Sequence, residues 1–300
     1  MGRRAGLGQA LELIAMRILI TGSQGRIGGF VTRALEPAHE LILLDTQPAP
    51  DSPHRFFQGD LCDPQLVTRA LEGVDAVAHL AANLSPSPQT YQRNTVGTWN
   101  LCAAAAEAGV RRVVFSSSIN VYGQGRYKIG RREFPPPYLP IDEDVPPRPE
   151  DSYGLSKWAN EQALRGFSDA YGIRAYCLRL PAVWVPARTE GYAPPPLEKC
   201  PALTPTRVID PWHYIDVRDV AAAFQMALES PRLPEFGVSY LLADDTTRPE
   251  PTAELFARLL PEWLSLGADR IPGHAPWFSS ARAKADLGWR PRYTWRRTKG

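Results

Sequence analysis

The sequence predicts an α/β protein built on a doubly wound parallel sheet, and two observations support this fold class. The first is a regular alternation, through the first 183 residues, of short apolar segments with segments of helical pattern. The expected strands are Arg17–Thr21, Glu40–Asp45, Arg55–Gln58, Asp75–Ala82, Val110–Ser118 and Arg174–Val183, and the expected helices are Gly29–Glu36, Pro64–Glu72, Tyr91–Ala108 and Tyr153–Tyr171. The second is that the strands are almost continuously apolar, which is typical of a sheet covered by helices on both faces. Together they indicate a Rossmann-type fold, whose ligands bind at the carboxyl ends of the strands.

The chain changes character after residue 183, because proline is frequent between Pro181 and Pro211. Beyond this stretch we expect helices at Asp216–Glu229, Thr252–Leu260 and Ser279–Trp289, and a strand at Val238–Ala243. We therefore expect three parts: a poorly ordered extension at residues 1–15, a Rossmann domain at residues 16–183, and a smaller C-terminal substrate lobe at residues 184–300.

Composition excludes several classes of function. The 34 basic and 32 acidic side chains give a net charge of only +2, which argues against a nucleic-acid-binding surface. Four cysteines without a C-x-x-C pair argue against a disulfide scaffold and a structural zinc site, and favour a reducing cytoplasm. No His, Asp or Glu cluster has metal-ligand spacing, so we expect no metal. No apolar run reaches about 18 residues, so we expect no membrane span.

A glycine-rich turn, Thr21–Gly28, connects the first strand to the first helix. Gly22 permits a tight turn, Gly25 lets the backbone approach a pyrophosphate, and Gly28 allows close packing of helix on strand. Free N–H groups at the start of the helix favour an anion there. The glycines alone fit a turn without a ligand equally well; the strand, the helix and Asp45 favour a dinucleotide.

Asp45, at the end of the second strand, indicates which dinucleotide binds. A carboxylate there accepts hydrogen bonds from the adenosine-ribose hydroxyls and repels a 2′-phosphate, so NAD is favoured over NADP. Arg26 in the turn is the opposing indication, because it could pair with that phosphate. Asp60 and Leu61 follow the next strand and could contact the adenine, although a plain turn explains them as well.

Tyr153 and Lys157 are four residues apart on an expected helix, so phenol and ammonium share one face. An adjacent ammonium favours the phenolate, which is the form that a general base needs. Such a pair also occurs by chance on surface helices. Ser118 ends a strand at the ligand edge and could hydrogen-bond a substrate oxygen, and Asn94 could anchor a water relay to Lys157.

At this point the sequence resembles the extended short-chain dehydrogenases/reductases, the NAD-dependent epimerase/dehydratase family. The matching segments are Thr21–Gly28, Asp45, Asp60–Leu61, His79–Ala82, Asn94–Asn100, Phe115–Gly123, Tyr153–Lys157, Leu178–Leu180, Tyr214–Ala221 and Leu287–Trp289. The resemblance implies catalytic roles for Asn94, Ser118 (with Ser117 as the fallback), Tyr153 and Lys157. The residues that it implies for NAD are Gly22, Gln24, Gly25, Arg26, Ile27, Gly28, Asp45, Asp60, Leu61, Leu80, Ala81, Ala82, Tyr153 and Lys157.

The resemblance implies hydride transfer to NAD and leaves the substrate open. The short, proline-rich stretch before Tyr214 is more similar to uronate dehydrogenase-like members than to those with a nucleotide clamp. For a sugar or sugar acid we expect contacts from Ser117, Ser118, Asn120, Arg179 and Arg207, with Arg218 as a further candidate. Trp212 and His213 either line the pocket or lie in the core and on the surface, respectively, and His79 is expected to be a packed histidine.

Three functions remain open: an NAD-dependent dehydrogenase of a small sugar, sugar acid or alcohol; a nucleotide-sugar 4-epimerase with bound NAD; and a non-catalytic nucleotide sensor. The intact Ser118, Tyr153 and Lys157 argue against the sensor. Family members often dimerise through the two long helices, so a homodimer is expected, although burial within the monomer explains the Ala103–Ala106 run equally well.

Overall fold

A seven-stranded parallel sheet forms the centre of the computed structural model, which describes residues 15–85, 87–123, 135–186 and 212–297. The strand order is β3-β2-β1-β4-β5-β6-β9, and every neighbouring pair is parallel. The strands are β1 (Arg17–Thr21), β2 (Glu40–Asp45), β3 (Arg55–Gln58), β4 (Ala76–His79), β5 (Arg112–Ser118), β6 (Arg174–Leu180) and β9 (Phe236–Tyr240). The order reverses direction between β1 and β4, which is where doubly wound folds bind ligands.

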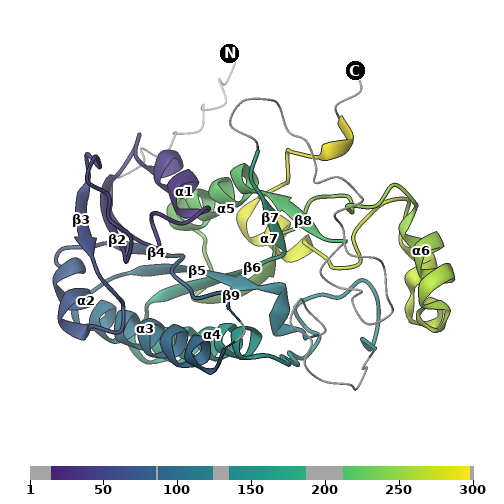
Figure 1. Ribbon diagram of the computed structural model, residues 1–300, viewed down its shortest axis with the longest axis horizontal. Helices are drawn as coiled ribbons and strands as arrows, with labels where there is room; N and C mark the ends of the chain where they lie inside the picture. Colours follow the sequence, from purple (N-terminus) through teal and green to yellow (C-terminus); the bar gives the residue numbers. More distant parts are fainter. Residues whose placement is uncertain (1–14, 86, 124–134, 187–211, 298–300) are drawn as a thin grey trace, which may run out of the picture.

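Helices cover both faces of this sheet, as the apolar strands require (Figure 1). On one face lie α1 (Gly28–Leu35) and α5 (Val217–Glu229), and on the other lie α2 (Pro64–Ala70), α3 (Pro88–Glu107) and α4 (Ser152–Tyr171). Each face of the sheet packs against its helices in a separate hydrophobic core, and successive residues of a strand point alternately into the two cores. In β5, Val114 packs on the α1/α5 side, whereas Val113 and Phe115 pack on the α3/α4 side. This alternation decides which side chains of β5 can meet α4.

Besides small shifts at the ends of elements, two features of the organisation differ from the expectation. The expected strand Arg174–Val183 is interrupted at Pro181, so β6 ends at Leu180 and β7 (Ala182–Trp184) pairs instead with β8 (Tyr214–Asp216) in a second small sheet. Proline has no N–H for a ladder, which accounts for the break. In addition, β9 and α5 belong to the main sheet and its cover, although their residues lie in the part that we expected to form only the smaller lobe.

An aromatic core holds the C-terminal lobe together. The lobe contains α6 (Thr252–Leu259), α7 (Ala281–Leu287) and short 3-10 turns, and α6 lies at the end of the molecule farthest from β3 (Figure 1). Trp212 and Trp277 are fully buried, with ring centroids 6.2 Å apart, and each also packs against Phe256. Trp212 is thus a core residue, and its neighbour His213 is buried rather than on the surface.

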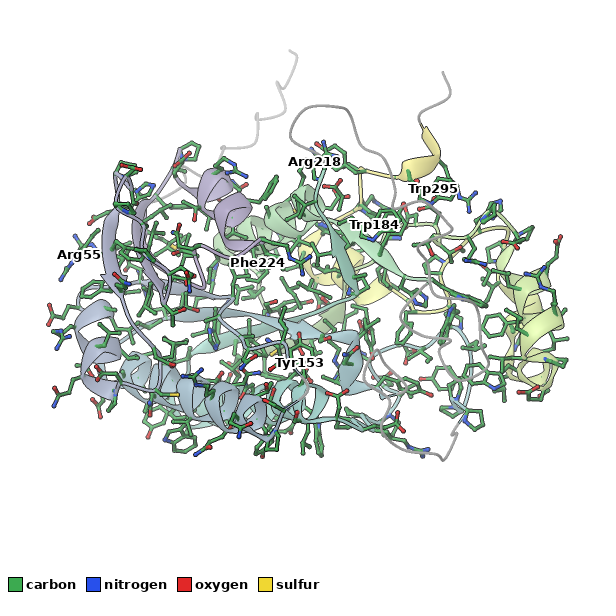
Figure 2. The ribbon with its side chains drawn as sticks, viewed as in Figure 1. Arg55, Tyr153, Trp184, Arg218, Phe224 and Trp295 are labelled. Carbon is green, nitrogen blue, oxygen red and sulfur yellow. The ribbon has the colours of Figure 1, made fainter. Side chains whose placement is uncertain are left out.

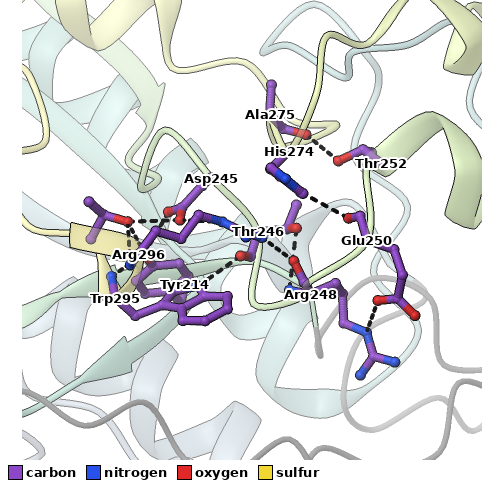
Figure 3. A network of polar contacts seen from close by, with 11 residues as sticks. Tyr214, Asp245, Thr246, Arg248, Glu250, Thr252, His274, Ala275, Trp295 and Arg296 are labelled. Atoms are coloured by element: carbon purple, nitrogen blue, oxygen red, sulfur yellow. Dashed lines mark hydrogen bonds and ion pairs between the residues drawn. The ribbon is translucent and has the colours of Figure 1, made fainter. Parts of the chain in front are cut away.

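The last described residues are fixed to the body of the protein by polar contacts (Figure 3). The Tyr214 hydroxyl donates to Asp245 at 2.6 Å, and Thr294 donates to the same carboxylate at 2.7 Å. The Trp295 indole donates to the Thr246 carbonyl at 3.0 Å. The C-terminal residues therefore join β8 to the lobe. No described helix is long and apolar enough to cross a membrane.

Candidate functional site

The glycine turn has the backbone geometry that the sequence predicts. Gly22 has φ +71°, and a Cβ there would lie 2.7 Å from the Ala81 nitrogen. A Cβ at Gly28 would lie 2.2 Å from the Gly22 carbonyl oxygen. Any side chain at these two positions would force the turn away from β4 or from its own helix. Gly25 is exposed at the tip of the turn, where its N–H donates to Gly22.

Donors and an acceptor meet at this turn. Within the described ranges, the N–H groups of Arg26 and Ile27 donate to no protein acceptor. The Asp45 carboxylate lies beside them and accepts from the backbone N–H of Gln24 and of Gln47, both at 2.9 Å. These two bonds hold the carboxylate at the end of β2. The arrangement offers free donors to a diphosphate and an acceptor to a sugar hydroxyl.

The other residues expected at the nucleotide lie along the neighbouring strand ends. Leu80, Ala81 and Ala82 follow β4 and are half-buried, and the N–H groups of the first two donate to the Thr21 hydroxyl. Asp60 is anchored by the Cys62 N–H at 2.9 Å and by Arg93 at 3.5 Å. Leu61 is buried, so its side chain is largely committed to the core beside α3.

His79 is the packed histidine that the sequence indicated. Its two ring nitrogens hydrogen-bond the hydroxyls of Thr21 at 2.8 Å and Thr98 at 2.9 Å. Burial, with a smaller contribution from the charge of Lys157, lowers the pKa of His79 to about 3. The ring therefore stays neutral and ties β4 to β1 and to α3.

This burial predicts a pH-dependent loss of stability. Below pH 6.5, the ordinary pKa of histidine, His79 binds a proton in the unfolded chain but not in the folded protein. The free energy of unfolding therefore has its full value above pH 6.5 and decreases as the pH falls towards 3. Because of His79, we expect the free energy of unfolding to decrease by about 1.4 kcal/mol for each pH unit below 6.5 in this window. Urea titrations at pH 7 and pH 5 should show this dependence removed in His79→Gln. His54→Gln, near the surface, is the control, and an unchanged slope in His79→Gln would contradict the assignment.

Tyr153 lies on the side of α4 that faces the sheet (Figure 2), and Lys157 contacts strand β5. Asp151 caps the helix by accepting from the Gly154 N–H at 2.8 Å. The buried Lys157 ammonium lies 4.7 Å from the Phe115 ring centre and 5.6 Å from the Tyr153 ring centre. It donates to the Ser116 carbonyl at 2.7 Å. Burial lowers the pKa of Lys157 to about 7, although the charge of Glu161 acts in the opposite direction.

Gly154 brings this helix against the end of β5. A Cβ on Gly154 would lie 2.6 Å from the Asn120 carbonyl oxygen, so the first turn of α4 rests directly on the backbone after Ser118. The Ser118 hydroxyl accepts from the Asn120 N–H at 3.2 Å. Tyr153 and Ser118 therefore flank one close backbone contact. The sequence placed Gly154 inside the tyrosine–lysine segment but assigned it no role; its position beside Tyr153 was the only indication.

Asn94 forms its hydrogen bonds with residues other than Lys157. Its amide nitrogen donates to the Asn83 carbonyl and to the Ser156 hydroxyl, both at 3.0 Å, and its amide oxygen accepts from the Asn83 N–H. Its backbone carbonyl accepts from Asn160 at 3.3 Å. The side chain joins α3 to α4 and the loop after β4, so its relay role stays a prediction.

Two expected substrate residues point elsewhere. Ser117 donates to Glu161 at 2.6 Å, and Arg179 forms a two-pronged ion pair with Glu161 at 2.9 and 3.0 Å. Arg179 lines a cavity of about 640 Å³ between α4 and β9 that none of the catalytic candidates lines. Both residues are odd-numbered, and the side chains of the odd-numbered residues of β5 and β6 face α4. The structure thus assigns Ser117 and Arg179 to the contact with Glu161, which corrects the expectation that they bind the substrate.

The remaining arginines are accounted for differently. Arg218 pairs with Asp216 at 2.8 Å and lies over the Tyr293 ring, with its guanidinium carbon 3.5 Å from the ring centre. It fixes the C-terminal residues to α5. Arg207 lies outside the described residues, as does the extension at residues 1–14. Within the described part of the chain, no group of three or more His, Cys, Asp or Glu side chains could hold a metal ion.

The model of the NAD dependent epimerase/dehydratase family matches residues 18–242. The chain belongs to this family. The match covers the whole glycine turn, Asp45, the end of β5 and the tyrosine–lysine face of α4.

Curated relatives in the family have two kinds of activity. UDP-glucose 4-epimerase of Halalkalibacterium halodurans is 32% identical over 55% of this chain and 50% of its own length. Uronate dehydrogenase of Pseudomonas syringae is 32% identical over 55% of this chain and 58% of its own length. L-arabinose 1-dehydrogenase of Haloferax volcanii is 32% identical over 55% of this chain and 66% of its own length. The matched segment thus spans about half to two thirds of these relatives.

A solved structure covers more of the chain. A short-chain dehydrogenase/reductase superfamily protein from Agrobacterium tumefaciens, with bound NAD, has a TM-score of 0.72 and 27% identity over 94% of both chains. The predicted fold class and the family resemblance are confirmed.

Proposed function

We propose that this protein is an NAD-dependent oxidoreductase that acts on a sugar, a sugar acid or a related small alcohol. The observation that supports it most is the contact between α4 and the turn after β5, which gathers Tyr153, Lys157 and Ser118 beside the carboxyl edge of the sheet. Two of the curated relatives named above are sugar or uronate dehydrogenases, which favours this chemistry.

The residues of the glycine turn fit NAD. Gly22 and Gly28 leave no room for a Cβ, and the free N–H groups of Arg26 and Ile27 suit a diphosphate. Asp45 suits the two ribose hydroxyls of NAD, and a 2′-phosphate would meet its negative charge. Gln24, Gly25, Asp60, Leu61, Leu80, Ala81 and Ala82 are proposed to surround the nucleotide with them.

The side chains have distinct tasks in the proposed reaction. When bound, NAD supplies the acceptor for the hydride that leaves the substrate carbon. Tyr153, as phenolate, takes the proton from the hydroxyl on that carbon, so that the carbon becomes a carbonyl. Ser118 hydrogen-bonds the same oxygen, and Asn120 supports the turn that carries Ser118. Lys157, in its charged form, stabilises the phenolate.

The proposal is tested with the purified protein and a panel of free sugars, sugar acids and UDP-sugars. We expect net NADH formation, followed at 340 nm, with at least one free sugar or sugar acid. A nucleotide-sugar 4-epimerase is the second candidate, favoured by the UDP-glucose 4-epimerase relative, and it would interconvert UDP-sugars without net NADH. Neither activity across the panel, with NAD bound, would point to the non-catalytic sensor.

Asp45 provides a prediction about cofactor choice. Asp45→Ala removes the acceptor for the ribose hydroxyls and the charge that opposes a 2′-phosphate. We expect NAD affinity to fall about tenfold, the equivalent of one charged hydrogen bond, and the preference over NADP to shrink by a similar factor. Calorimetric titration with both dinucleotides measures this. Asp51→Ala, an exposed carboxylate outside the site, is the control; equal affinities in wild type and Asp45→Ala would refute the assignment.

We also propose that a second copy of this chain covers an apolar face on α3 and α4. Trp99 is 59% exposed and Tyr171 63% exposed, and Phe167 lies between their rings, 5.1 Å and 5.5 Å away. Val96 and Leu155 add exposed apolar surface on the same two helices. Ala104 and Ala105 are buried within the monomer, so these two alanines do not contribute to this face. The described cysteines are free, which supports a cytoplasmic location.

Trp99→Glu should separate the copies, because a carboxylate at the centre of an apolar interface is desolvated without a partner. We expect light scattering to report a dimer for the wild type and a monomer for Trp99→Glu. Arg69→Glu, a charge change on α2, should leave the dimer intact. A monomeric wild type at 100 µM or so would remove the proposal.

A further inference from the structure

A buried ion pair lies beneath the catalytic side of α4. The side chains of Glu161 and Arg179 are 1% and 4% exposed, and two hydrogen bonds of 2.9 and 3.0 Å join them. Arg179 also donates to the Tyr240 hydroxyl at 3.0 Å, and the Tyr240 N–H donates to Glu143 at 2.7 Å. The pair is therefore anchored from α4 through β6 to the edge strand β9.

The position of Glu161 on its helix matters. Tyr153, Lys157 and Glu161 are spaced four residues apart, so they lie on one side of α4. The helix then meets β5 at two successive residues. The Lys157 ammonium holds the Ser116 carbonyl at 2.7 Å, and the Glu161 carboxylate accepts from the Ser117 hydroxyl at 2.6 Å.

The two contacted residues, Ser116 and Ser117, directly precede Ser118 in the chain. Ser117 points to α4, whereas Ser118 is the last residue of the strand and directs its hydroxyl to the turn that follows, where it accepts from the Asn120 N–H. A short, charge-assisted hydrogen bond on residue 117 thus limits how far residue 118 can slide or rotate relative to the helix. Arg179 orients the Glu161 carboxylate for this bond through its two hydrogen bonds.

We propose that Glu161 is a positioning residue. Oriented by Arg179, it accepts the hydrogen bond of the Ser117 hydroxyl and thereby fixes the position of Ser118 relative to Tyr153 and Lys157. The inference rests on the proposed function, because the register matters chemically only where these three side chains act on one substrate. It explains why a serine, rather than an apolar residue, stands at an inward-facing strand position.

Lysine resonances offer a test that needs no substrate. The chain has five lysines, at positions 128, 157, 199, 284 and 299, so ¹³Cε labelling gives few signals, and the missing one in Lys157→Met assigns Lys157. The NAD-loaded protein is compared as wild type, Ser117→Ala and Ser168→Ala. Ser168 is the matched control: a buried serine on the same helix, whose hydroxyl donates to the Glu235 carbonyl at 2.9 Å, far along α4 from the site.

We expect the Lys157 resonance to shift in Ser117→Ala and to stay in place in Ser168→Ala, although both variants lose one buried hydrogen bond. The turnover number should fall roughly tenfold in Ser117→Ala alone, with little change in KM, because a displacement of a fraction of an ångström weakens the reacting geometry. The double variant Glu161→Leu/Arg179→Met, which removes both charges together, should show the same Lys157 shift.

An unmoved Lys157 resonance in Ser117→Ala, or equal shifts in both serine variants, would overturn the inference. Failure of the proposed function is recognised separately, in the wild type, as absent NAD binding or absent turnover across the panel. The Lys157 comparison is then made on the protein without NAD, and it still decides whether Glu161 positions the strand.

Discussion

Replacing Tyr153 with phenylalanine is expected to lower the turnover number by about 10³-fold, within the range that one positioned general acid–base contributes. The ring stays, so its packing beside Lys157, 5.6 Å from the ammonium, should persist. Only the phenolate oxygen that accepts the substrate proton is lost. NAD affinity should change less than threefold, because the glycine turn and Asp45 lie on other strands. NADH formation and calorimetric NAD binding, measured on the same preparation, separate the two effects.

Tyr171→Phe is the matched control for this variant. Tyr171 ends the same helix and is exposed on the face away from the sheet, so removing its hydroxyl should leave turnover unchanged. Turnover retained in Tyr153→Phe would show that another group takes the proton. A parallel loss of NAD affinity would instead show that the phenol serves mainly to hold the dinucleotide.

The course of the main sheet could be predicted because its strands are buried on both faces, and such strands appear in the sequence as plain apolar runs. The exceptions have local causes. Pro181 divides an apolar run that looked like one strand, and the second piece joins β8, a strand some thirty residues further on. No periodicity within either piece shows that pairing. Likewise, nothing in Phe236–Tyr240 indicates that it completes the main sheet rather than the lobe.

The geometry of the candidate site could be predicted where it follows from spacing along one element, as for Tyr153 and Lys157, whose catalytic roles stay a prediction. It was predicted poorly where a role depends on a distant partner. Ser117 and Ser118 look alike in the sequence, and only the position of Glu161, 44 residues later, shows that Ser117 faces the helix. Arg179 looked available for a carboxylate, yet its carboxylate is Glu161 of the protein itself. The roles of the three serines at the end of β5 could be assigned only once the structure showed which strand positions face α4.

Gly154→Ala is expected to damage the reaction without touching any group that reacts. The new Cβ would lie 2.6 Å from the Asn120 carbonyl oxygen, and Pro149 lies on the same side at 3.4 Å, so the helix or the turn must move. Tyr153 and Ser118 flank that contact, and a displacement near 1 Å is enough to lower kcat/KM by about 10²-fold. The overlap should also reduce the free energy of unfolding by about 1–3 kcal/mol, as overpacked buried positions do.

Gly166→Ala, on the same helix, makes the comparison decisive. No atom lies within 4 Å of a Cβ at Gly166, so alanine there should gain about 0.5–1 kcal/mol from helix propensity and leave kcat/KM unchanged. Opposite signs of the stability change in the two variants, measured by urea titration, would locate the effect in the contact with Asn120 rather than in the helix. Because the alanine methyl carries no charge and no hydrogen bond, a loss of activity in Gly154→Ala alone would measure how closely the tyrosine and the serine must approach. If both variants were equally active, the close contact would be dispensable, and another element would have to set that approach.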